Sequence, residues 1–359
     1  MQDEQVYNIV VLDIGSRGGL HRCWHHFAFP IELYFFEPEP EGFEALSNAC
    51  ATEGDSGNLY HVMNAAVDGG TGERALNIYS NRAASSFFEH VPGGCYRFEN
   101  NVVECKVPVP TISISDLVAQ EGVKPKFMTI DVEGAELDVL RGGEAVLASM
   151  VLGLRCEVGF SDIYSGAPEF DQVVGYLRGI GFRLARVETC NAGLYGLTTD
   201  MNKYSVSPMD AMPLAADMIF VNRRLVDELI GTDAAPQAVM DLFNAVLFCI
   251  HNGCGYLGMD FLEQMVAKGL WNTYQATWPA RADEFACHVA AYFAVPRKNI
   301  NKFFDPPAIF DELLGRDYAS ALDAASKGAM DKISTVYNDD LLFSRLMAPD
   351  GQYDTVSDL

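Results

Sequence analysis

Val10-Val-Leu-Asp-Ile-Gly-Ser-Arg-Gly-Gly19 is the stretch from which the architecture of the chain is predicted. An apolar run that begins at Val6 ends in the acid Asp13 and passes directly into glycines at positions 15, 18 and 19. This pattern predicts a buried strand and a tight turn, because glycine adopts positive φ and lets a ligand approach the main chain closely. The turn is interpreted either as the floor of a nucleotide-type pocket or as a plain strand-turn-helix corner.

A second apolar run, Ile31 to Phe36, also ends in an acid, Glu37. Glu37 follows Asp13 at about the distance that one strand-helix-strand unit requires. A carboxylate at this place can accept hydrogen bonds from the vicinal hydroxyls of a ribose. The alternative is a strand end that carries a charge without binding a ligand.

Apolar runs and amphipathic stretches then alternate as far as residue 222. Further strands are predicted at 59–67, 74–79, 102–109, 126–130, 151–158, 182–187, 193–197 and 218–221, and helices at 20–29, 41–51, 113–120, 137–147 and 169–180. This alternation predicts a doubly wound, mostly parallel sheet that binds ligands at the carboxyl ends of its strands. Four acids fall at such ends, and we expect them to converge: Asp13, Glu37, Asp131 and Glu157.

Three details refine this prediction. Gly142-Gly143 is expected to interrupt the helix whose buried face holds Leu137, Leu140, Val146 and Leu147. The run 102–109 alternates like an exposed or edge strand, which Pro108 and Pro110 also favour. The segment 80–101 has little periodicity, and a long irregular loop in a compact domain is often functional; it contains Ser85, Ser86, Phe87, Phe88, His90 and Tyr96.

The pattern changes near Gly231, where strand-like alternation stops. Apolar residues recur at helical spacing, as in Val239, Leu242, Phe243, Val246 and Leu247. We therefore predict two domains, residues 1–230 with the sheet and residues 231–359 with five to seven helices. The second domain supplies no motif of function, and a homo-oligomer formed through it is left open.

The composition is that of an ordinary globular protein with a strong acidic excess. The chain has 359 residues, 49 acids against 25 bases and a formal net charge of −24, so nucleic acid is not expected as a partner. Its polar N-terminus does not resemble a signal peptide, and no apolar run is long enough to span a membrane. Nine scattered cysteines fit reduced thiols in the cytoplasm, and core packing is favoured over metal for Cys249, His251 and Cys254.

Five short blocks resemble the FkbM family of S-adenosylmethionine-dependent methyltransferases. They are Asp13–Gly19, Phe36–Pro40, Asn64–Asp68, Ile130–Glu136 and Val139–Gly143. The block that begins Ile130-Asp-Val-Glu-Gly-Ala-Glu136 is the most specific, and the resemblance covers about residues 6 to 222. One residue departs from it, since Arg17 stands where the family usually has Asn.

The resemblance implies a Rossmann-like class I methyltransferase sheet of seven strands with the last one reversed. It also implies S-adenosylmethionine over the turn at 15–19, with Glu37 on its ribose, and methylation of a hydroxyl on a sugar, glycan or other secondary metabolite. The residues expected to bind the cofactor are Asp13, Gly15, Ser16, Gly19, Glu37 and Asn64.

Methyl transfer to a hydroxyl requires in-line positioning and a base within hydrogen-bond reach of the acceptor. The candidates are Asp131, Glu133 and Glu157, with His61 and His90 behind them. Helix capping is the alternative role for Glu133, and the three acids could instead hold Mg²⁺, which prefers oxygen ligands.

Two other functions remain open at this point. The first is a catalytically silent scaffold that keeps the fold and binds a partner through the helical region, because function resides in the site and not in the fold. The second is a nicotinamide oxidoreductase, which the glycine spacing disfavours because Arg17 replaces the second glycine of G-x-G-x-x-G.

Overall fold

The computed structural model describes residues 9–19, 24, 27–52, 57–92, 101–193, 212–232, 234–294 and 313–324. They fall in two compact units, Met1–Ala245 and Val246–Leu359, and each unit is described by itself. Some predictions lie wholly or mostly outside the described residues: the strand start at Val6, the helix at 20–29, Tyr96 and the strand at 193–197.

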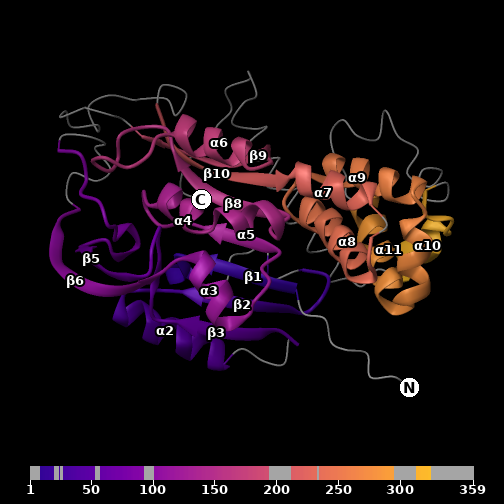
Figure 1. Ribbon diagram of the computed structural model, residues 1–359, viewed down its shortest axis with the longest axis horizontal. Coiled ribbons are helices and arrows are strands. Elements are labelled where there is room, and N and C mark those ends of the chain that lie inside the picture. The colour runs from indigo at the N-terminus through magenta and orange to yellow at the C-terminus, as the bar shows by residue number, and fades with distance from the viewer. Residues whose placement is uncertain are drawn as a thin grey trace, which may run out of the picture. The chain divides into compact units, whose positions relative to one another are not determined.

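The first unit is built on a seven-stranded sheet (Figure 1). Its strands follow the order β3 (Leu59–Met63), β2 (Ile31–Phe36), β1 (Ile9–Ile14), β7 (Phe127–Ile130), β8 (Gly153–Gly159), β10 (Met212–Asn222) and β9 (Phe182–Gly193). Neighbouring strands from β3 to β8 are parallel, whereas β10 is antiparallel to both β8 and β9. The predicted doubly wound sheet with a reversed last strand is confirmed.

Helices cover this sheet and share its core. One cluster of buried apolar side chains joins the central strands to α3 (Ile114–Glu121), α4 (Glu136–Gly142), α5 (Glu144–Ser149) and α6 (Phe170–Gly179). The strands read as continuous apolar runs because both of their faces are buried. α2 (Pro40–Thr52) follows β2, and α7 (Arg223–Gly231) follows β10, where the Asn222 side chain accepts a hydrogen bond from the Leu225 N–H.

The predicted glycine break separates α4 from α5. A Cβ at Gly142 would lie 2.5 Å from the Asp68 carbonyl oxygen, and one at Gly143 would lie 2.7 Å from the Ile114 side chain. Close packing therefore requires both glycines. The four residues predicted for the apolar face of this segment, Leu137, Leu140, Val146 and Leu147, are buried.

A smaller sheet has the order β4 (Ala66–Val67), β6 (Val103–Ile112) and β5 (Gly72–Tyr79). The single strand predicted at 59–67 is therefore two strands in two sheets. Asn64 turns the chain between them, because its amide donates to the main-chain carbonyls of Glu37 and Pro38. β4 reaches only Thr111 and Ile112 of β6, so the prolines of β6 lie where it pairs with β5 alone.

β9 and β10 are longer than the apolar runs that predicted them. The runs at 182–187 and 218–221 correspond to strands of 12 and 11 residues. The two strands pair through most of their length, including the polar stretch from Glu188 to Ala192 that no apolar run marks. An apolar run in the sequence predicts only the stretch of each strand that is apolar, so the polar stretch beyond it was missed.

The second unit is helical. The described helices after α7 are α8 (Pro236–His251), which crosses the boundary between the units, α9 (Gly255–Ala267), α10 (Leu270–Thr277), α11 (Pro279–Ala294) and α13 (Tyr318–Ala324). Phe248, Phe261 and Phe285 are fully buried, and Cys249, Cys254 and Cys287 are buried cysteines. Among the described residues, no helix has the length and apolarity that crossing a membrane requires.

Candidate active site at the carboxyl ends of the strands

The glycine turn after β1 touches the loop after β7 through main-chain atoms. Gly15 has φ +88°, and a Cβ on it would lie 1.7 Å from the Asp131 carbonyl oxygen. Its N–H donates to the Phe36 carbonyl, so the turn is also tied to the end of β2. Glycine is therefore required at position 15, both for its conformation and for this contact.

Glu37 lies in a prepared position directly after β2. Its side chain is buried, one carboxylate oxygen accepts the Glu39 N–H at 2.8 Å, and a Cβ at Gly42 would lie 2.8 Å from its carboxyl carbon. Burial raises the pKa of this carboxyl. A ligand with two hydroxyl donors would replace part of the solvation that Glu37 loses.

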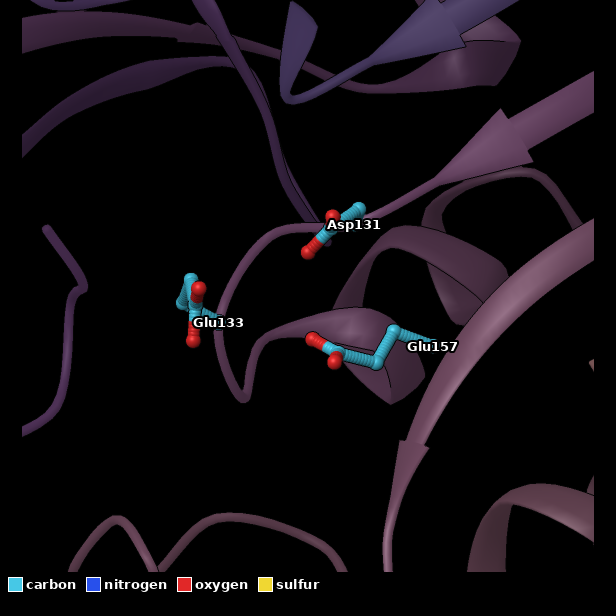
Figure 2. A group of neighbouring side chains, drawn as sticks. All are labelled: Asp131, Glu133 and Glu157. Atoms are coloured by element: carbon cyan, nitrogen blue, oxygen red, sulfur yellow. The ribbon is translucent and has the colours of Figure 1, made fainter. Parts of the chain in front are cut away.

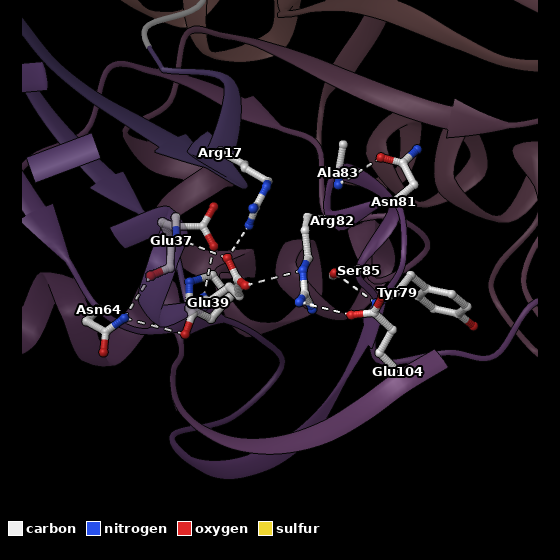
Figure 3. Close-up of polar contacts among 12 residues, drawn as sticks. Arg17, Glu37, Glu39, Asn64, Tyr79, Asn81, Arg82, Ala83, Ser85 and Glu104 are labelled. Carbon is white, nitrogen blue, oxygen red and sulfur yellow. Dashed lines mark hydrogen bonds and ion pairs between the residues drawn. The ribbon is translucent and has the colours of Figure 1, made fainter. Parts of the chain in front are cut away.

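Glu39 is a second buried acid at this point, and the sequence reasoning did not single it out. Its carboxylate accepts the Gly42 N–H at 3.0 Å, which caps α2, and it forms an ion pair with Arg17 (Figure 3). Arg82 approaches Glu39 at 4.0 Å and pairs with Glu104 at 3.0 Å. Arg17, which departs from the family pattern, is thus held beside the acids at the end of β2.

A cavity of about 70 Å³ opens between these loops. Its walls come from the turn after β1, the segment after β2, the loop 82–87 and the loop after β7, and they include Gly15, Arg17, Glu37, Asp131 and Glu133. We call it the first cavity.

Three acids lie together where β7 and β8 end (Figure 2). Asp131 follows β7 directly, Glu133 lies two residues further on, and Glu157 is in the last half of β8. One carboxylate oxygen from each lies within 4.8 Å of the others. Of the four acids expected to converge, Asp131 and Glu157 therefore lie together here, with Glu133 beside them, and the oxygens of these three match the ligand type of Mg²⁺.

Glu133 has a strained main chain that two distant residues hold in place. Its φ of +55° is the one positive value found among the described residues other than glycine, a conformation that costs about 1–3 kcal/mol. The Ser86 hydroxyl donates to its carbonyl oxygen at 2.6 Å, and the Tyr164 hydroxyl donates to its carboxylate at 2.6 Å. The structure therefore fixes where this carboxylate points.

The neighbouring carboxyls share their protons unequally. Desolvation and the charges of Asp131, Glu133 and Glu136 raise the pKa of Glu157 well above its usual range. Asp131 is exposed and lines the first cavity. The surrounding protein still desolvates Asp131 and raises its pKa, but by less than that of Glu157, because a hydrogen bond from Glu157 favours the charged form of Asp131. Within this pair, Glu157 is therefore the more favoured proton donor and Asp131 the more favoured acceptor.

Glu136 organises the turn that carries these acids. It is buried at the start of α4, and one of its oxygens accepts the N–H groups of Val132 at 3.2 Å and of Gly134 at 3.0 Å. Desolvation raises the pKa of Glu136 to about 7. Glu136 thus supports the turn before α4 from the first residue of the helix.

A second cavity, of about 190 Å³, lies beside the first. Its walls come from the end of β8 and the segment 161–169, from the loop at 81–84, and from Leu214 and Ala215 of β10. Glu133 and Ala83 line both cavities, whereas Glu157 lines only the second and Asp131 only the first. One carboxylate thus stands where the two spaces adjoin.

Comparison with known proteins assigns the sheet-bearing part of the chain to a family. The family model described as "Methyltransferase FkbM domain" matches residues 14–184. Residues 14–184 are an FkbM methyltransferase domain. The match begins in β1 and ends in β9, and it includes the glycine turn after β1 and the loop after β7.

Two solved structures are similar to the chain at low identity. A methyltransferase FkbM from Methylobacillus flagellatus has 13% identity and a TM-score of 0.33 over 59% of this chain and 43% of that one, which is less than half of its length. A Streptococcus pneumoniae protein proposed to be a tRNA (m1A22) methyltransferase has 11% identity and a TM-score of 0.29 over 93% of this chain and 94% of that one. No curated protein matches the chain.

The structure of the FkbM domain distributes the predicted cofactor residues between cavity wall and support. Gly15 and Glu37 line the first cavity. The other four line neither cavity: Asp13, Ser16, Gly19 and Asn64. Ser16 donates its hydroxyl to the Asp13 carbonyl, and Asn64 holds the turn after Glu37, so these side chains shape the loops around the cavity.

Neither candidate histidine lies in the cavities of the FkbM domain. His61 stacks on Tyr34 and contacts Glu32 at 3.0 Å, while His90 stacks on Tyr79, and neither ring lines a cavity wall. The sequence reasoning missed Tyr164 and Arg82. It did mark the loop 80–101, and the described part of that loop contributes to both cavities.

Proposed function

We propose that the chain is an S-adenosylmethionine-dependent O-methyltransferase that acts on a hydroxyl of a sugar, a glycan or another secondary metabolite. The observation that carries this proposal is the pair of adjoining cavities with Glu133 between them. An FkbM domain needs one space for a methyl donor and one for an acceptor, and a group that serves both has to face both.

The first cavity has the features that suit the donor. Gly15 offers main-chain atoms without a side chain, and Glu37 offers a buried carboxylate at the end of β2. We assign Gly15 and Glu37 as direct contacts, with Glu37 binding the ribose, and Asp13, Ser16, Gly19 and Asn64 as residues that form the surrounding loops. The volume of about 70 Å³ requires the ion pairs of Glu39 with Arg17 and Arg82 to shift when the donor enters.

The chemistry assigns different work to the three acids. S-adenosylmethionine supplies a methyl carbon on a sulfonium, and the S–C bond breaks toward sulfur as the new C–O bond forms. Glu133 accepts the hydroxyl proton, because this residue lines both cavities and Tyr164 fixes the direction of its carboxylate. Glu157, whose pKa the protein raises further than that of Asp131, orients Asp131 and does not act as the base.

Calorimetric titration with S-adenosylmethionine tests this proposal against a silent scaffold. We expect binding by the wild-type chain and at least about a tenfold loss for Glu37→Ala, which removes a charged hydrogen-bond acceptor. Glu44→Ala, on the exposed side of α2, is the matched control and should bind like the wild type. Absence of binding by the wild-type chain would favour the scaffold, and unchanged binding by Glu37→Ala would remove the ribose assignment.

A second assay on the same protein tests whether methyl transfer depends on a metal ion. The three acids converge closely enough to hold a divalent cation, but in-line transfer from a sulfonium does not itself require one. We therefore expect methyl transfer to continue in excess chelator. Complete loss of transfer that added Mg²⁺ restores would assign the acids to a metal ion.

A further inference from the structure

The charged groups that line the second cavity are all acidic. Five of its lining residues carry carboxyls: Glu133, Glu136, Glu157, Asp162 and Glu169. Within the described part of the chain, no lysine, arginine or histidine lines it. The first cavity differs, because Arg17 and Arg82 balance its acids. The single sign of charge is therefore a property of the second cavity and not of the whole site.

These acids occupy two levels of the cavity. Glu133 and Glu157 are partly buried at its inner end, while Asp162 and Glu169 are exposed where the segment 161–169 forms the wall. Glu136 does not count toward ligand binding, because its oxygen is used by the N–H groups of Val132 and Gly134. Carboxyl groups thus line both the partly buried and the exposed part of the second cavity.

The remaining wall is mostly apolar or small. Ile163, Pro168 and Leu214 face the same space as the acids. The volume of about 190 Å³ lies below the roughly 300–1,000 Å³ of pockets for drug-sized ligands, so the space admits a small molecule or one terminal unit of a larger one.

This distribution of charge selects among acceptors. A phosphorylated or carboxylated compound would meet acidic side chains and no basic ones in the described lining, whereas an ammonium group would find carboxylate acceptors there. A metal ion would need only the cluster at the inner end and would leave Asp162, Glu169 and the apolar wall without a role.

We propose that the acceptor is a small polyhydroxylated amine, such as an amino sugar, whose ammonium group is held by the acids of the second cavity while a hydroxyl faces Glu133. This inference rests on the proposed function and names the acceptor class of the same site. The hydroxyl loses its proton to Glu133 and gains the methyl group, and the ammonium keeps its charge throughout.

Three hexose derivatives of different charge test the charge preference. Glucosamine, glucose and glucose 6-phosphate are titrated in mildly acidic buffer into the protein saturated with S-adenosylhomocysteine, and dissociation constants are measured by saturation-transfer NMR. We expect glucosamine to bind about tenfold more tightly than glucose, the effect of a charged hydrogen bond, and glucose 6-phosphate not to bind. Equal binding of all three, or preference for the phosphate, would overturn the proposal.

Charge-neutral variants of the outer acids locate the preference. Asp162→Asn and Glu169→Gln should each weaken glucosamine binding by about threefold, with little change for glucose, because an exposed charge contributes modestly. Glu169→Gln keeps a side-chain acceptor for the N-terminus of α6. Asp171→Asn on the exposed side of α6 is the matched control. A glucosamine preference that survives both variants unchanged would move the ammonium site elsewhere and contradict the proposal.

Two further readouts separate this inference from the function on which it rests. The titrations are repeated in excess chelator, and loss of glucosamine binding there would assign the acids to a metal ion and sink the ammonium site. If S-adenosylhomocysteine itself fails to bind, the proposed function fails first. If it binds and the hexoses show no preference by charge, only the acceptor class is wrong.

Discussion

At the residue scale, the site depends on one carboxylate whose position the chain fixes from three directions. Glu133 takes its direction from its own strained main chain, from Ser86 and from Tyr164. Asp131 and Glu157 lie beside it and share a hydrogen bond, and the protein raises the pKa of Glu157 further than that of Asp131. Position alone would not separate a base from an orienting acid, whereas protonation state does.

This difference predicts opposite tolerance to the same chemical change. Glu133→Gln should lower kcat by about 10²- to 10⁴-fold, because it removes the base. Glu157→Gln should lower kcat by only a few-fold, since the amide still donates to Asp131 as the protonated acid does. Kinetics of both variants, with melting temperatures to confirm folding, check this. Equal loss in both would mean that the cluster acts as a unit and that Glu133 is not the base.

The sequence predicted the acids of this site better than their partners. Asp131 and Glu37 follow apolar runs, so their place at strand ends could be read from the pattern. Tyr164 and Ser86 reach Glu133 from 31 and 47 residues away, and nothing in the sequence marks such a contact. The motif that contains Asn64 marks its position, whereas only the structure shows that its amide donates to the Glu37 and Pro38 carbonyls.

At the element scale, the turn between β7 and α4 organises the site. It places Asp131 and Glu133 in a short stretch of irregular chain, and Glu136 binds its N–H groups from the first turn of the helix. Because Glu136 is desolvated, its charged form lowers the stability of the folded protein, and this effect depends on pH.

The raised pKa of Glu136 fixes the sign of that dependence. With a folded pKa of about 7 against 4.5 for the ordinary carboxyl, the folded state binds more protons between these values, so stability falls as pH rises from the lower to the higher. Glu136→Gln keeps an acceptor and removes the charge. We expect it to stabilise the protein at about pH 8 by roughly 1–3 kcal/mol, with almost no gain at about pH 4.5.

Thermal unfolding at the two pH values measures this difference. Glu121→Gln, at the exposed end of α3, is the control for loss of one surface charge. If Glu136→Gln destabilises the protein equally at both pH values, the charge of Glu136 is not what sets the pH dependence, and the prediction is wrong.

Element lengths were less predictable than element order, because the outer strands β9 and β10 carry polar residues that interrupt the apolar pattern.

At the scale of the whole molecule, the two compact units divide within α8, between Ala245 and Val246. The sequence placed the change of composition near Gly231, since helical periodicity begins there. An ion pair connects the first half of α8 to the sheet of the first unit. Lys126, which precedes β7, contacts Asp241 of α8 at 2.7 Å, and both side chains are largely buried. Composition marks where helices begin, whereas long-range contacts decide to which unit they belong.

Removing this ion pair tests the assignment of residues 236–245 to the first unit. Asp241→Ala should destabilise that unit by about 3–5 kcal/mol, because it leaves a buried lysine charge without compensation. The double variant Lys126→Met with Asp241→Leu should recover much of that loss. Calorimetric unfolding of the full chain measures both. A negligible effect of Asp241→Ala would place the boundary nearer Gly231.

The central claim is that the methyl donor occupies the first cavity with Glu133 at its reacting end, and one measurement tests it most directly. A crystal structure of the full chain with S-adenosylhomocysteine should show the ribose hydroxyls on the Glu37 carboxylate, the ligand against Gly15 without displacement of the turn, and the sulfur on the side that opens toward Glu133. A ligand bound elsewhere, or one bound there with its sulfur turned away from the second cavity, would contradict the account.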